Sequence, residues 1–244
     1  MKILGVIPAR YASTRFPGKP LIEIGGKSMI RRVYEQANLA KSLTHVIVAT
    51  DDQRIADEVE SFGGEYVMTN SAHESGTDRC AEVAKIVEGY DVIINIQGDE
   101  PFINPLQIDL LANLFKEDTE IATLIKPIQE QDELVNPNLP KVVISKQGKA
   151  LYFSRTPIPY LRGVDIHNWN AKHQYFRHIG IYGYRKNILL QLTNLPISLL
   201  EKSEQLEQLR WLENGFNIQT AITEFETIAV DVPEDLDKIK AWYL

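Results

Sequence analysis

The first 96 residues alternate short apolar runs with stretches in which apolar residues recur every three or four positions. In the stretch 29–39, Met29, Ile30 and Val33 share one side of a helix, and Ser28 is a residue type that caps helix N-termini. Runs and periodic stretches that alternate in this way form βαβ units and a parallel sheet. Because the runs are apolar nearly throughout, we expect helices on both faces of the sheet. The predicted strands are 3–7, 46–49, 66–68 and 92–96, and the predicted helices are 29–39, 55–62 and 80–87.

The residues that follow these strands suggest where a site lies, because parallel sheets bind ligands beyond the carboxyl ends of their strands. Cations follow the first strand, and acidic residues follow two of the others. They are Arg10, Arg15 and Lys19 after 3–7, Asp51 and Asp52 after 46–49, and Asp99 and Glu100 after 92–96. A cationic loop and an acidic turn are therefore expected to face each other across one cleft.

Composition limits the class of protein. The 244 residues are 44% hydrophobic, enough for one large domain or a domain with an insertion. The 26 basic and 33 acidic residues leave a net charge of −7, which argues against nucleic-acid or anionic-membrane binding. The apolar start is too short for a signal peptide or a membrane span, so we expect a cytoplasmic protein. Cys80 is the single cysteine, so no internal disulfide can form.

The loop 10–19 is the strongest binding candidate. Its prolines stiffen it and Gly18 permits close backbone approach, so its cations and amides can converge on a polyphosphate. In an acidic protein we prefer this interpretation to a solvated surface. The nearby 25–28 (Gly-Gly-Lys-Ser) is no Walker A motif, because residue 21 is Leu where that motif needs Gly. We expect these glycines to form a tight turn into the helix.

Asp99 follows a buried strand and is placed by Gly98, which suits a ligand of Mg²⁺. This ion takes one or two protein carboxylates and otherwise phosphate oxygens and water. Asp231 is our candidate for the second carboxylate, ahead of Asp235 and Asp237. Capping of the last helix is an equally good interpretation of Asp231.

Other polar residues admit both a structural and a functional interpretation. Ser75 or Thr77 could cap helix 80–87, with Arg79 directed toward the cleft to contact a phosphate or nucleoside. Alternation along a strand predicts that His178 and Tyr182 share a face, although a lone histidine is more often structural. Arg155 could hold a substrate carboxylate or form a structural ion pair.

From about residue 121 the pattern changes to short strand-like pieces with many aromatic residues. We predict one domain over 1–244, with a strand-rich insertion at about 121–184. The aromatic residues exceed what such an insertion needs for its own core, which predicts a homodimer interface. The elements expected here are strands 122–125, 141–145 and 151–154, helix 203–213, strands 216–222 and 228–230, and a closing helix from Pro233.

Six short motifs are spread along the chain. They are Ile-Pro-Ala-Arg-Tyr-Ala-Ser-Thr-Arg-Phe-Pro-Gly-Lys-Pro-Leu from residue 7, Ser-Gly-Thr-Asp-Arg from 75, Gln-Gly-Asp-Glu-Pro from 97, Tyr-Phe-Ser-Arg from 152, His-Ile-Gly-Ile-Tyr-Gly-Tyr from 178 and Glu-Gln-Leu-Arg from 207. Together they resemble those of the 3-deoxy-manno-octulosonate (Kdo) cytidylyltransferases, also called CMP-Kdo synthetases. The resemblance spans essentially the whole chain.

The resemblance implies a nucleotide-diphospho-sugar transferase (Rossmann-like) fold, with a mixed, mainly parallel sheet and an inserted dimerisation subdomain. It also implies a Mg²⁺-dependent homodimeric enzyme that converts CTP and Kdo to CMP-Kdo and pyrophosphate for lipopolysaccharide synthesis. The anomeric hydroxyl of Kdo would attack the α-phosphorus in line with the departing pyrophosphate. Matching positions imply catalytic roles for Arg10, Lys19 and Asp99; nucleotide contacts for Arg10, Arg15, Lys19, Ser75, Arg79 and Gln97; sugar-acid contacts for Gln97, Arg155, His178, Tyr182, Glu207 and Gln208; and metal binding by Asp99 and Asp231.

Alternatives differ in chemistry. CMP-sialic acid synthetases share the opening Ile-Pro-Ala-Arg but look different after it, which favours Kdo over sialic acid. A glycosyltransferase would use a nucleotide sugar and an Asp-x-Asp motif, where this chain has Gln97-Gly98-Asp99. A nucleotide sensor would bind CTP without consuming it. The segment 161–174 matches no family pattern, so discrimination between Kdo and its 8-amino analogue stays open.

Overall fold

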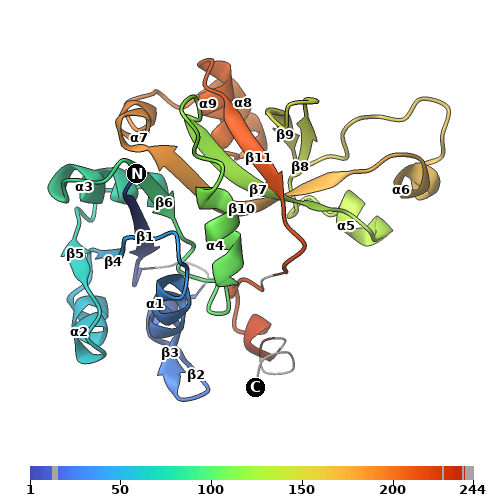
Figure 1. Ribbon diagram of the computed structural model, residues 1–244. Coiled ribbons are helices and arrows are strands. Elements are labelled where there is room, and N and C mark those ends of the chain that lie inside the picture. The colour runs from blue at the N-terminus through green and yellow to red at the C-terminus, as the bar shows by residue number, and fades with distance from the viewer. Residues whose placement is uncertain (13–15, 227, 238, 240–244) are drawn as a thin grey trace. The chain divides into compact units, whose positions relative to one another are not determined.

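The computed structural model describes residues 1–12, 16–226, 228–237 and 239 (Figure 1). The chain divides into two compact units. Unit 1 consists of Met1–Asn113, Gly183–Thr193 and Phe225–Leu244, and unit 2 of Leu114–Tyr182 and Asn194–Glu224. The predicted single domain with an insertion at about 121–184 stays a prediction.

Unit 1 contains a parallel sheet that confirms the four N-terminal strand predictions. Its strands are β1 (Ile3–Ala9), β4 (His45–Thr50), β5 (Tyr66–Met68) and β6 (Val92–Asn95), in the order β6-β1-β4-β5. Each adjacent pair is parallel. Nearly all residues of β1, β4 and β6 are buried, as expected for strands that are covered on both faces.

Three helices begin at side-chain caps that the sequence supplies. Ser28 caps α1 (Met29–Asn38), Asp52 caps α2 (Gln53–Ser61), and Ser75 forms a capping box with Asp78 at α3 (Gly76–Ile86). The chain moves from β1 to β4 and β5 and then returns past β1 to β6. Because such crossovers are right-handed, α1 and α2 cover one face of the sheet and α3 covers the other, as Figure 1 shows.

Smaller elements complete unit 1. A 3-10 helix, η1 (Lys19–Leu21), leads into the hairpin of β2 (Glu23–Ile24) and β3 (Lys27–Ser28), so Gly25 and Gly26 form the predicted turn before α1. The helices α4 (Pro105–Ala112) and α7 (Lys186–Leu192) also belong to this unit. Cys80 is buried on α3.

Unit 2 contains a mixed sheet. Its strands are β7 (Ile121–Pro127), β8 (Lys141–Ile144), β9 (Ala150–Ser154), β11 (Ile218–Ile222) and the larger part of β10 (Phe176–Arg185), which continues into unit 1. β11 is parallel to β7, whereas β8 is antiparallel to both β9 and β10. With the four parallel strands of unit 1, this confirms the predicted mixed, mainly parallel α/β fold.

The segment 161–174 packs into unit 2 through Trp169. It contains the short helices η2 (Ile166–Asn168) and α6 (Trp169–Lys172). Trp169 is buried against Ile128, Tyr175 and Leu134, the last of which lies on α5 (Gln131–Val135). The Trp169 and Tyr175 rings are stacked, with 6.0 Å between their centroids. The segment without a family pattern therefore contributes an aromatic anchor to this core.

Two element predictions in the last third were wrong. The expected helix 203–213 is two helices, α8 (Leu199–Glu204) and α9 (Gln208–Glu213), because Gln205 adopts a left-handed φ of 51°. Residues 228–230 form no strand: the Val230 amide donates to the Asp99 carbonyl and the Val230 carbonyl accepts from Lys19 Nζ. The closing helix is present at residues 235–237 and 239.

None of the helices in the described part of the chain is both long and apolar enough to cross a bilayer.

Candidate nucleotide site

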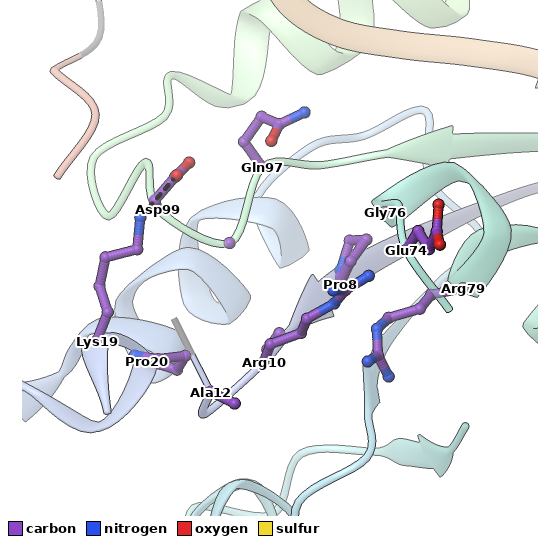
Figure 2. A pocket seen from close by; sticks show the side chains of 12 residues that line it. Pro8, Arg10, Ala12, Lys19, Pro20, Glu74, Gly76, Arg79, Gln97 and Asp99 are labelled. Atoms are coloured by element: carbon purple, nitrogen blue, oxygen red, sulfur yellow. Dashed lines mark hydrogen bonds and ion pairs between the residues drawn. The ribbon is translucent and has the colours of Figure 1, made fainter. Parts of the chain in front are cut away.

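A pocket of about 650 Å³ opens in unit 1 beyond the carboxyl ends of β1 and β6. Strand order reverses around β1, which has β4 on one side and β6 on the other. Such a switch point is where open α/β sheets bind ligands, and the volume suits a small molecule. Figure 2 shows the lining side chains, among which the sequence predicted Arg10, Lys19, Arg79, Gln97 and Asp99.

Gly98 lets the two sides of this pocket meet. A Cβ atom at residue 98 would lie 2.6 Å from the Pro8 carbonyl oxygen, closer than real Cβ atoms come to other atoms. Only glycine therefore allows the loop after β6 to lie against the end of β1. This packing places Gln97 and Asp99 beside the cationic loop that begins at Arg10.

Lys19 lies between the two predicted metal-binding carboxylates. Its Nζ is 2.9 Å from Asp99 Oδ2 and 3.8 Å from Asp231 Oδ1, and it also donates to the Val230 carbonyl at 2.7 Å. The Lys19 side chain is 15% exposed, that of Asp99 26% and that of Asp231 47%. The structure thus places Asp99 and Asp231 beside one cation, the Lys19 ammonium. Metal binding by the two carboxylates stays a prediction.

The Asp235 carboxylate binds the backbone of this turn, and capping of the last helix by Asp231 stays a prediction. Asp235 Oδ2 accepts from the backbone N–H groups of Asp231 at 3.0 Å and Val232 at 3.2 Å. The Asp231 carboxylate lies 3.8 Å from Lys19 Nζ, and its backbone N–H donates to Asp235. No group of three or more His, Cys, Asp or Glu side chains with metal-site geometry occurs among the described residues. Two carboxylates suit Mg²⁺, which completes its shell with phosphate oxygens and water.

Two arginines line the other side of the pocket. Arg10 Nη2 donates to the His73 carbonyl. Arg79 is fully buried: its Nη1 donates to Thr69 Oγ1 at 2.6 Å and its Nη2 lies 3.0 Å from Asp51 Oδ2. Burial, and next the positive charge of Arg79, lower the pKa of the Arg10 guanidinium. An anion bound beside both arginines would relieve this repulsion.

Ser75 has the capping role that its sequence position suggested. Its Oγ accepts from the Asp78 amide at 3.1 Å, and the Asp78 carboxylate accepts from the Ser75 amide at 3.2 Å. A nucleotide contact by Ser75 stays a prediction. Arg15 lies outside the described residues.

Sequence reasoning missed Glu74, which lines the pocket just before the Ser-Gly-Thr-Asp-Arg motif. Its position next to that motif was the available signal. Asp51 was flagged only as part of an acidic turn, but its pairing with Arg79 depends on the tertiary fold.

The predicted sugar-acid residues His178 and Tyr182 both lie in unit 2 and share a face of β10, as alternation indicated. Their ring centroids are 5.1 Å apart. His178 Nε2 is 3.0 Å from Thr123 Oγ1, and its ring meets Phe153 edge-on with a centroid distance of 5.3 Å. His178 is partly exposed as a residue, but its ring is buried among these groups. Burial of the ring lowers the pKa of His178 to about 3. Burial, and next the charge of Glu207, raise the pKa of Tyr182 well above its usual range. Both side chains are thus neutral near pH 7 and suited to hydrogen bonding.

Arg155 acts as a backbone cross-link in unit 2. Its Nε donates to the Glu204 carbonyl at 2.6 Å, its Nη1 to the Pro137 carbonyl at 2.9 Å and its Nη2 to the Gln205 carbonyl at 3.1 Å. The Glu204 and Gln205 carbonyls lie at the break between α8 and α9, so Arg155 connects this break to Pro137. Arg155 thus has a structural role, as one of the two interpretations from sequence expected. Its partners are backbone carbonyls, whereas the sequence suggested an ion pair. A contact with a substrate carboxylate stays a prediction.

Glu207 and Gln208 begin the short helix α9. Glu207 Oε1 is 3.1 Å from Arg210 Nη2. Gln208 is buried, and its Nε2 has no hydrogen-bond partner among the described residues. A buried amide of this kind has a donor to offer a ligand. The sugar contact stays a prediction.

The histidine geometry predicts a pH effect on stability. Below pH ~6.5 the unfolded chain protonates His178 while the folded chain, with a pKa of about 3, does not. The stability from this group is therefore fully present above pH ~6.5 and is lost as the pH falls, by up to ~1.4 kcal/mol per pH unit. His178→Gln should flatten this decline when urea unfolding is compared between pH 7 and pH 5. The exposed His167 supplies the control, because His167→Gln should leave the slope as in the wild type. Equal slopes for all three proteins would contradict the buried neutral state.

Comparisons with known proteins place the chain in a family. Residues 4–227 match the family model described as Cytidylyltransferase. The 3-deoxy-manno-octulosonate cytidylyltransferase of Parabacteroides distasonis is 56% identical and that of Cytophaga hutchinsonii 55% identical. The matches cover 99% of this chain and 98% of the first relative, and 98% of this chain and 96% of the second.

Solved structures agree. The structure of CMP:2-keto-3-deoxy-manno-octonic acid synthetase complexed with CTP superposes with a TM-score of 0.92 at 45% identity, over 99% of this chain and 98% of the other. A cytidylyltransferase from Leptospira borgpetersenii superposes with a TM-score of 0.66 at 17% identity, over 100% of this chain and 88% of the other. At this identity the match shows the shared fold alone. On its full-length identity to these relatives, the chain belongs to the 3-deoxy-manno-octulosonate cytidylyltransferase family.

Proposed function

We propose that this protein transfers CMP from CTP to Kdo and releases pyrophosphate. The observation that carries the proposal is the pocket at the β1/β6 switch point, where Arg10, Lys19 and Asp99 converge in a chain of this family. In the reaction, the anomeric oxygen of Kdo forms a bond to the α-phosphorus as the bond to the pyrophosphate oxygen breaks. The hydroxyl proton is released.

The pocket cations would bind and neutralise the triphosphate. Arg10, Arg15 and Lys19 are assigned to the phosphates, where charge grows on the departing pyrophosphate. Ser75 and Arg79 are assigned to the rest of CTP, with Arg79 held in place by Asp51 and Thr69.

The sugar acid is assigned to six residues, among them Gln97, His178 and Tyr182. His178 and Tyr182 would donate or accept hydrogen bonds as neutral groups, because the pKa of His178 is lowered and that of Tyr182 is raised. Arg155, Glu207 and Gln208 complete the assigned set. Positioning of the two substrates is the main contribution expected of these residues.

Asp99 and Asp231 are the residues that would hold Mg²⁺. The support is that both carboxylates already surround one cation, Lys19 Nζ. When bound there, the ion would polarise the α-phosphate and acidify the attacking hydroxyl. A homodimer, a cytoplasmic location and a role in lipopolysaccharide synthesis complete the proposal.

The test is pyrophosphate release from CTP and Mg²⁺ with Kdo, 8-amino-Kdo or N-acetylneuraminic acid supplied separately. Release with Kdo is the expected result. Release only with another acid would retain the transfer reaction but overturn the sugar assignment. CTP binding without release would overturn the enzymatic proposal in favour of a nucleotide sensor.

Arg155 yields a two-part prediction. Arg155→Ala should raise KM for Kdo and leave KM for CTP unchanged, because the guanidinium is assigned to the sugar carboxylate. It should also lower the free energy of unfolding by about 1–3 kcal/mol, since the loss leaves backbone carbonyls without their donors. Steady-state kinetics and urea unfolding measure the two effects, with the exposed Arg162→Ala as control. An unchanged KM for Kdo in the folded variant would refute the sugar role and leave the structural one.

A further inference from the structure

Tyr11 joins the two ends of the cationic loop. It directly follows Arg10, and its carbonyl accepts a hydrogen bond at 2.9 Å from the amide of Gly18, which directly precedes Lys19. Arg10, Ala12 and Lys19 line the pocket, whereas Tyr11 is absent from the lining. Tyr11 is therefore placed to fix the loop without contacting a ligand in the pocket.

The Tyr11 ring packs against the backbone of Gly18. A Cβ atom at residue 18 would lie 3.2 Å from the ring carbon Cζ and 3.2 Å from the hydroxyl oxygen of Tyr11. Gly18 also has a left-handed φ of 73° as the residue that precedes η1. The left-handed φ favours glycine, and a Cβ atom at this position would crowd the Tyr11 ring. The ring thus packs against the residue that directly precedes Lys19.

Arg54 holds the same ring from helix α2. Its ζ carbon is 3.3 Å from the Tyr11 ring centroid, a cation–π contact. Arg54 is itself oriented by Asp52, with Nε to Oδ1 at 2.9 Å and Nη2 to Oδ2 at 2.6 Å. Asp52 Oδ1 also caps α2 through the Arg54 amide at 3.0 Å. The Arg54 guanidinium is therefore paired with the N-cap residue of α2.

We propose that Tyr11 is a positioning residue for triphosphate binding, and that Tyr11, Gly18, Asp52 and Arg54 form a clasp that sets the spacing of Arg10 and Lys19. The Arg54 side chain is 58% exposed, so the clasp adds little to global stability. Its consequence is the placement of two pocket cations, and small misplacements of binding groups are costly. This inference rests on the proposed use of CTP at the same site.

The test separates positioning from packing with matched variants. Tyr11→Leu removes the ring, Tyr11→Phe keeps it, and Arg54→Ala removes the cation. The controls come from a similar arrangement in the same unit, where Arg31 lies 5.7 Å from the Phe62 ring centroid and Tyr34 packs on Phe62 at 5.5 Å. These controls are Arg31→Ala and Tyr34→Leu. The readouts are kcat, KM for CTP, calorimetric binding of inorganic tripolyphosphate, and Tm.

We expect Tyr11→Leu to raise KM for CTP and Kd for tripolyphosphate about tenfold, and Arg54→Ala about threefold. Tyr11→Phe should stay within about twofold of the wild type, because the ring makes the contacts. Equal effects of Tyr11→Leu and Tyr34→Leu would overturn the clasp, as would a Tyr11→Phe variant as weak as Tyr11→Leu. If Tyr11→Leu does not fold, the test is the comparison of Arg54→Ala with Arg31→Ala. Equal KM for CTP and equal Kd for tripolyphosphate in these two variants would overturn the clasp. Wild-type protein that binds tripolyphosphate but releases no pyrophosphate from CTP and Kdo would refute the proposed function, while the binding series would still test the clasp.

Discussion

Asp99→Asn should lower kcat by at least about 100-fold while leaving the fold intact. The substitution keeps the shape of the side chain but removes the negative charge that lies 2.9 Å from Lys19 Nζ. An amide is also a poor ligand for Mg²⁺ compared with a carboxylate. Fold retention is expected because the Asp99 side chain is partly exposed and the turn is held by backbone contacts, including the bond from Val230 N–H to the Asp99 carbonyl.

The measurement is single-turnover pyrophosphate release at saturating CTP over a range of Mg²⁺ concentrations. The matched control is Asp118→Asn, at an exposed aspartate in unit 2, which should react at the wild-type rate. Near-normal turnover with a normal Mg²⁺ response in Asp99→Asn would contradict the assignment of Asp99 as a Mg²⁺ ligand. A large loss in both variants would point to general damage instead.

Lys19→Met should affect both chemistry and stability. Loss of the ammonium removes a cation assigned to the departing pyrophosphate, so we expect kcat to fall about 100-fold and KM for CTP to rise. It also removes the donor to Asp99 and to the Val230 carbonyl, which should cost about 1–3 kcal/mol of unfolding free energy. Asp231 should add little to this cost, because its side chain is 47% exposed and screened by solvent.

A divalent cation gives this variant a second readout. If Asp99 and Asp231 bind Mg²⁺, the ion should raise the Tm of Lys19→Met more than that of the wild type, because it restores a cation between the two carboxylates. The control is Lys27→Met, which breaks a more exposed ion pair with Glu35 at 2.6 Å. An equal Mg²⁺ effect on both variants would contradict binding between Asp99 and Asp231.

Local pattern predicted the sheet and helices of unit 1. The strands β1, β4, β5 and β6 are short apolar runs because both faces of the sheet are covered, and the helices between them begin at Ser, Asp and Ser caps. These signals lie within a few residues of the elements that they mark. The position of the pocket followed from them, since it requires only parallel strands and their carboxyl ends.

Prediction failed where contacts distant in sequence decide the backbone. The break at Gln205 is stabilised by Arg155, which lies 50 residues away and donates to the Gln205 carbonyl. Residues 228–230 are apolar like a strand, but the N–H and carbonyl of Val230 bond to Asp99 and Lys19. No local propensity contains this information.

The α/β class, the cationic loop and the acidic turn follow from the amino-acid order alone, because hydrophobic period and charge are local properties of the chain. How those groups are paired depends on the folded arrangement. It placed Lys19 between Asp99 and Asp231, buried Arg79 on Asp51, and set Tyr11 against Gly18 and Arg54. These pairings join residues brought together by parallel strands, and their distances depend on packing that no window of sequence records.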